Sequence, residues 1–206
     1  MRPFALPVIV SFLAPALALV LLLGLAAQQC RLNPRGLKWC LGMALVAFGL
    51  LLAPVKGLAS ARWLAGIADH WSVPLMAVLL SAVARRCFGI ELLRDKDRRA
   101  AWVFGVVAGV ALYPLAMGWG PVDPFGLGWH FGLLFVVVAL VAALLLWRRN
   151  RFGIVLLAAI AAWHLGLPES GNYWDCLLDP IFFVVSLGAL ARRLCAPRIF
   201  PATPEH

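Results

Sequence analysis

Long stretches without charged side chains constrain this chain more than any other feature. The run from Phe125 to Trp147 contains no Asp, Glu, Lys or Arg, and it is long enough to cross the ~30 Å hydrocarbon core of a bilayer as a helix. Over the whole chain 64% of residues are hydrophobic and 13% are charged, against about 45–50% and about 25% in soluble domains. This composition excludes a disordered chain, a secreted disulfide scaffold and a nucleic-acid binder.

The hydropathy pattern predicts an all-α, polytopic integral membrane protein with seven transmembrane helices, forming one domain over residues 1–206. The predicted spans cover residues 4–27, 37–55, 72–88, 101–118, 124–147, 152–167 and 173–191. Arg2 before an apolar run is also typical of a signal peptide, but this run exceeds the ~7–15 residues of a signal h-region. We therefore expect a retained anchor. Residues 56–71 place small and apolar side chains at helical spacing and predict a short amphipathic helix on the outer surface before the third span.

The basic residues test this arrangement of spans independently. Lys and Arg number three, six, three and three in the connections on one side, and one, two, none and none on the other. Because short basic connections stay in the cytoplasm, the fifteen-to-three division predicts an outer N-terminus and a cytoplasmic C-terminus. Within the cytoplasmic connections, residues 91–99 form a charge-rich turn that we expect to be solvated and to touch anionic headgroups.

Composition also suggests a location and excludes some partners. Arg supplies fifteen of the eighteen basic residues, a bias common in GC-rich bacterial genomes, so we expect a bacterial inner membrane. The five cysteines form no CxxC pair and have no metal-ligand spacing, which predicts no metal and no cofactor. The expected surroundings are the lipid bilayer, a lipid or lipid-linked ligand, and a membrane protein partner.

Acidic and histidine residues concentrate in the outer half of the predicted bundle. Ionisable groups near or inside a bilayer are costly, and they indicate function unless they have a structural role. Asp179, His130 and His164 reach comparable depths on the last three spans, and Asp175 lies one helical turn from Asp179. A carboxylate that orients a histidine is general-base geometry. The two histidines and the aspartate could equally hold a divalent metal, although the sequence has neither an HxxxH nor an HExxH motif. The catalytic candidates are therefore Asp179, His130, His164 and Asp175, and the ligand-binding candidates are Tyr113, Asp123, Glu169, Asn172 and Trp174.

Helix capping is the competing explanation for several of these residues. Asp123 followed by Pro124 is a preferred helix start, and Asn172 with Asp175 has capping-box spacing. Asp179, placed inside the seventh span, is not explained by capping in this scheme. We therefore expect it to pair with His130 or His164.

Three classes of function remain open from the sequence. The first is a non-enzymatic subunit, scaffold or assembly component, since the chain has neither a nucleophile motif nor a phosphate loop. The second is an intramembrane enzyme that acts on a lipid or lipid-linked substrate through the outer Asp/His pocket. The third is a small transporter, although we find no repeat and no charge in the middle of a span.

Overall fold

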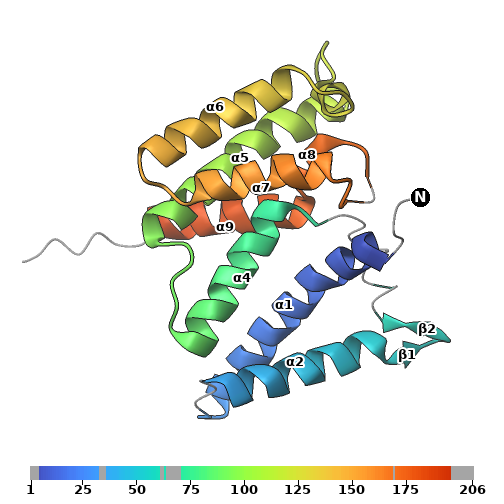
Figure 1. Ribbon diagram of the computed structural model, residues 1–206, viewed down its shortest axis with the longest axis vertical. Coiled ribbons are helices and arrows are strands. Elements are labelled where there is room, and N and C mark those ends of the chain that lie inside the picture. The colour runs from blue at the N-terminus through green and yellow to red at the C-terminus, as the bar shows by residue number, and fades with distance from the viewer. Residues whose placement is uncertain (1–4, 33–35, 61–62, 64–70, 169, 196–206) are drawn as a thin grey trace, which may run out of the picture.

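The computed structural model describes residues 5–32, 36–60, 63, 71–168 and 170–195, with the backbone alone over 5–11. This part of the chain is all-α apart from one small hairpin (Figure 1). The α-helices are α1 (Ala5–Gln29), α2 (Leu37–Leu52), α4 (Val73–Phe88), α5 (Asp95–Ala116), α6 (Leu133–Trp147), α7 (Phe152–His164), α8 (Tyr173–Leu177) and α9 (Pro180–Cys195). A 3₁₀ helix, η1 (Pro124–Gly128), precedes α6, and the hairpin consists of β1 (Pro54–Val55) and β2 (Leu58–Ala59).

Polar and glycine residues at the helix ends set several of these boundaries. Ser72 begins α4 by accepting the Leu75 N–H at 3.3 Å. Gly89 ends α4 with a φ of 71°, in the left-handed region that glycine adopts without steric cost. Asp123 accepts the Phe125 N–H at 2.9 Å. The predicted cap at Asp123 is therefore confirmed, although it opens η1 and not a long helix.

Two hydrophobic clusters hold the helices together, and α4 contributes to both. Val20 of α1, together with Met43 and Ala47 of α2, packs on one part of α4. A larger cluster joins α4 to α5–α9 and includes Phe135 and Leu156. In Figure 1 the α1–α2 pair therefore lies beside a bundle of α5, α6, α7 and α9, with α4 between them.

Two glycines allow α5 and α9 to pack at close range. Gly105 and Gly109 form a Gly-x-x-x-Gly pattern on α5. A Cβ atom built on Gly109 would lie 2.1 Å from Cδ2 of Phe183, and one built on Gly105 would lie 2.3 Å from Oγ of Ser186. Small residues at this spacing are the usual means by which membrane helices approach each other closely.

Two of the described helices are long and apolar enough to cross a membrane, as judged by length and composition: Phe12–Gln29 within α1, and α5 over Asp95–Ala116. The helices α2, α4, α6, α7 and α9 have 13–16 residues, or about 20–24 Å at 1.5 Å per residue. Each is therefore shorter than the ~30 Å thickness of the hydrocarbon core.

The predicted fifth and seventh spans are wrong as single continuous helices. Residues 124–147 divide into η1 and α6, and residues 173–191 divide into α8 and α9. Leu178, between α8 and α9, is extended with φ −148° and ψ 132°. The cause of the second break is Pro180, because a proline disfavours helical backbone in the residue before it and cannot donate the N–H that a continuous helix needs.

The hairpin occupies part of the segment for which we predicted an amphipathic helix. β1 and β2 are antiparallel, with Val55 opposite Leu58. Lys56 and Gly57 form the turn with φ values of 50° and 82°, as a two-residue hairpin turn requires. Most of the predicted amphipathic helix, residues 61–62 and 64–70, lies outside the described residues.

Polar contacts gather the basic connections at one end of the molecule. The loop before α2 meets the end of α4, the α4–α5 connection meets the α6–α7 connection, and the end of α9 reaches the start of α5. The pairs are Gly36 N–H with Cys87 O (2.8 Å), Arg94 Nη2 with Arg149 O (2.8 Å), and Arg193 Nη2 with Asp95 Oδ1 (4.0 Å). We call this the basic end.

Candidate functional site

Asp179 is the buried acid at the junction of three helices. Its side chain is almost fully enclosed, with 3% of its surface exposed. Oδ1 accepts the Phe182 N–H at 2.7 Å, which makes Asp179 the N-cap of α9, and Oδ2 accepts the Ser72 N–H at 2.9 Å. Asp179 followed by Pro180 therefore repeats the helix-start pattern of Asp123 and Pro124.

The position of Asp179 corrects our expectation for its partner. Both of its oxygens accept backbone N–H groups. Among the residues that the structure describes, neither a hydrogen bond nor an ion pair joins it to His130 or His164. The carboxylate therefore joins the start of α4 to the start of α9.

Asn172 and Trp174 connect the start of α8 to η1. Oδ1 of Asn172 accepts the Trp174 N–H at 2.9 Å, and its Nδ2 donates to Phe125 O at 3.0 Å. Nε1 of Trp174 donates to Pro124 O at 2.8 Å. The predicted helix cap at Asn172 is confirmed. Gly128 leaves room for this contact, because a Cβ atom there would lie 1.8 Å from Oδ1 of Asn172.

Asp175 bonds to a serine and not to the backbone of Asn172. Ser170 Oγ donates to Oδ2 of Asp175 and accepts the Asn172 N–H at 3.0 Å. Ser170 therefore completes the cap for which we predicted Asp175. Glu169, another ligand-binding candidate, lies outside the described residues.

The two histidines lie apart from Asp179 in different surroundings. His130 is exposed in the loop between η1 and α6. His164 ends α7, and its ring centre lies 6.0 Å from that of Phe131 and 5.4 Å from that of Trp163. His164 also lines a small cavity of about 260 Å³ together with Ser170.

Tyr113, the remaining candidate, is half-buried near the end of α5. Its ring centre lies 5.3 Å from that of Phe183 on α9, with 55° between the ring planes. The structure thus brings Tyr113 against α9, the helix that Asp179 caps. Within the described part of the chain, His, Cys, Asp and Glu side chains nowhere gather in groups of three that could hold a metal ion.

Asp97 is a buried acid that the sequence analysis did not single out. We expected residues 91–99 to be a solvated turn, but Asp97 is fully enclosed in the first turn of α5. Its Oδ2 accepts the Arg94 N–H at 2.9 Å, and its Oδ1 accepts the Arg151 N–H at 3.0 Å. Nη1 of Arg151 in turn donates to the carbonyl oxygens of Glu91 and Leu92. Asp97 therefore fastens the start of α5 to the connection before α7.

A sequence signal for Asp97 was present in the spacing of Arg94 and Asp97. An acid three residues after a helix start reaches back to the backbone N–H of the cap residue. The contact with Arg151, 54 residues further along the chain, has no such local signal.

Comparisons with protein-family models, curated proteins and solved structures find no match to the chain.

Proposed function

We propose that this chain is a multi-pass integral membrane protein that acts as a non-enzymatic component, a subunit or scaffold, of a bacterial inner membrane. The observation that carries the proposal is how the buried polar groups are used. Asp97, Asn172 and Asp179 all accept backbone N–H groups at helix starts or connections. Their oxygens are thus occupied in holding helices together.

The distribution of apolar side chains supports insertion in a membrane. Large apolar side chains are exposed on the outer faces of several helices, among them Leu45 at 72%, Val107 at 63% and Leu140 at 65%. A soluble monomer rarely exposes contiguous apolar patches of more than a few hundred Å². Buried polar side chains with exposed apolar ones suit lipid surroundings, where backbone groups must bond within the protein.

The gathering of the basic connections supports a topology of seven crossings. All four connections that we assign to the cytoplasm are linked to the basic end by polar contacts. The outer connections meet elsewhere, through Trp174 and Pro124 and through Ser72 and Asp179. Crossings by helices of 13–16 residues would require the bilayer to thin locally or the helix ends to extend into the interface.

Purification from native membranes tests the proposed role. After mild cross-linking, a tagged chain should carry a membrane protein partner at a fixed stoichiometry, as read by mass spectrometry. The exposed apolar faces predict that this partner is itself membrane-embedded. A chain that remains monomeric, with no partner in a constant ratio, would contradict the role of subunit or scaffold.

The cavity beside His164 favours a second candidate, an intramembrane enzyme that acts on a lipid-linked substrate. Ser170 lines this cavity with His164, and its Oγ is bonded to Asp175. A serine, a histidine and a carboxylate are the parts of a nucleophilic site. The substitution Ser170→Ala distinguishes the two candidate functions. If the protein is an enzyme, the variant should lose turnover of the lipid-linked substrate. If it is a scaffold, the variant should still copurify with its partner.

A further inference from the structure

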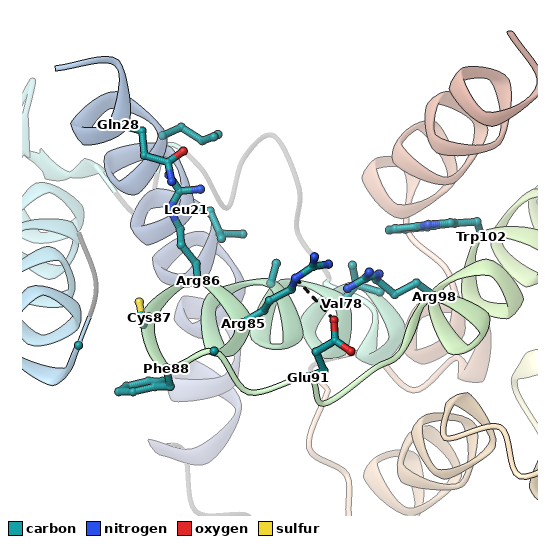
Figure 2. Close-up of a pocket in the computed structure, with 14 residues that line it drawn as sticks. Leu21, Gln28, Val78, Arg85, Arg86, Cys87, Phe88, Glu91, Arg98 and Trp102 are labelled. Atoms are coloured by element: carbon teal, nitrogen blue, oxygen red, sulfur yellow. Dashed lines mark ion pairs between the residues drawn. The ribbon is translucent and has the colours of Figure 1, made fainter. Parts of the chain in front are cut away.

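A large cleft opens between α1, α4 and α5 at the basic end (Figure 2). Its volume is about 1190 Å³, above the ~300–1,000 Å³ range of common ligand pockets. One part of its wall is apolar and is formed by Leu21, Leu25, Val78 and Trp102, with further small side chains between them. The cleft therefore has an apolar interior at the level of the predicted membrane boundary.

Three arginines and a single acid line the mouth of this cleft. Arg85 and Arg86 come from α4 and Arg98 from the first turn of α5. Figure 2 shows Arg85 and Arg98 near Glu91, and Arg86 extending toward Gln28. Arg98 also donates to Asp95 Oδ1 and to Leu93 O. Glu91 is the acid, and its Oε1 lies 3.7 Å from Nε of Arg85. Both side chains of this ion pair are about half exposed, at 54% and 49%. The attraction between Arg85 and Glu91 is therefore weak, because solvent screens it.

Arg86 has hydrogen-bonding capacity that the protein does not use. Its Nη2 donates to Gly24 O on α1, while its Nε is buried and has no partner among the described residues. This Nε packs against α1, since a Cβ atom built on Gly24 would lie 2.5 Å from it. An anionic group in the cleft would balance the excess positive charge of the lining residues, three arginines and one glutamate.

We propose that this cleft binds an anionic phospholipid from the cytoplasmic leaflet, an inference that rests on the proposed topology. The phosphate lies among Arg85, Arg86 and Arg98, and an acyl chain follows the apolar wall toward Leu21 and Val78. Guanidinium groups bind phosphate through paired charge-assisted hydrogen bonds. Basic pockets between transmembrane helices on the cytoplasmic side are suited to such headgroups.

Lipid binding to the purified full chain in neutral detergent tests the site. Phosphatidylglycerol, phosphatidylcholine and inorganic phosphate are titrated separately, and binding is read from the melting temperature and from native mass spectrometry. Phosphatidylglycerol should raise the melting temperature and stay bound, whereas the zwitterionic lipid and free phosphate should not. Replacing both Arg85 and Arg86 by Gln should weaken the affinity for phosphatidylglycerol about tenfold or more, since it removes charge-assisted hydrogen bonds to the phosphate.

Two further variants separate binding in the cleft from general effects of charge and folding. Arg149→Gln with Arg192→Gln removes two charges near the same end from residues that do not line the cleft, and should leave the affinity within about twofold. Ala82→Phe keeps every charge but fills the cleft, and should weaken binding as strongly as the double Arg85/Arg86 change.

Several results would overturn the proposed lipid site. Equal stabilisation by phosphatidylcholine would show that the cleft does not recognise the anionic headgroup. Equal stabilisation by inorganic phosphate would show that the site binds phosphate and not a lipid. An equal loss in the control variant would leave only a general charge effect. Because binding is measured in detergent, its outcome is independent of the cysteine labelling that tests the topology.

Discussion

At the scale of single residues, the buried carboxylates of this protein act as connectors between helix starts. Asp179 accepts one N–H at the start of α9 and another from Ser72 at the start of α4, 107 positions earlier in the chain. Asp97 connects the start of α5 with the segment before α7 in a similar way. A carboxylate has two oxygen atoms, so each can accept one of the two N–H groups. The side-chain amide of asparagine has a single oxygen, which would have to accept both.

Asp179→Asn should therefore lower stability by about 1–3 kcal/mol, because the amide NH₂ cannot accept the N–H that Oδ1 or Oδ2 now receives. The measurement is thermal unfolding of the purified chain in detergent. Asp123→Asn is the matched control, since Asp123 is exposed and accepts one N–H, and Asn caps a helix about as well as Asp. Equal melting temperatures for the two variants would contradict the connecting role of Asp179.

Caps that depend on neighbouring residues could be predicted from the sequence, whereas contacts between distant segments could not. Asp123 and Asn172 were predicted correctly because the bonded N–H groups lie two residues away. The apolar run around Asp179 predicts one continuous span with this residue inside it, although Pro180 indicates a helix start. Its bond to Ser72 depends on how α4 and α9 pack, which no local pattern encodes.

At the scale of elements, close packing of α5 against α9 is the contact most sensitive to side-chain size. Gly105 and Gly109 leave space that Phe183 and Ser186 of α9 occupy. This pattern was readable in the sequence and predicts close helix contact. The sequence could not tell which helix would occupy the space, because α9 follows α5 by more than sixty residues.

Gly109→Leu should separate α5 from α9 and lower stability by about 1–3 kcal/mol or more, because overpacking a filled contact displaces neighbouring side chains. Gly188→Ala on α9 is the control, since a Cβ atom there meets nothing within 4 Å. That change should be neutral or stabilising by up to about 1 kcal/mol. Unfolding in detergent measures both, and an unaffected Gly109→Leu variant would show that α5 and α9 are not closely packed.

At the scale of the whole molecule, polar groups lie in the interior and at the ends, and apolar side chains cover much of the exterior. The number of Lys and Arg in each connection predicts that four connections share one side of a membrane. The structure gathers those connections at the basic end through contacts such as Arg94 with Arg149. The lengths of the helices were predicted less well, because prolines and glycines at 124–132 and Pro180 interrupt the helix inside apolar runs.

The central claim is that the basic end faces the cytoplasm, and labelling of single cysteines tests it most directly. In a chain without its five native cysteines, Asp95→Cys marks the basic end, and Val122→Cys marks a connection that we propose to lie on the outer side. Both positions are exposed. A membrane-impermeant maleimide applied to intact cells should label Cys at 122 and leave Cys at 95 unlabelled until the membrane is opened. Labelling at 95 in intact cells, with none at 122, would contradict the account.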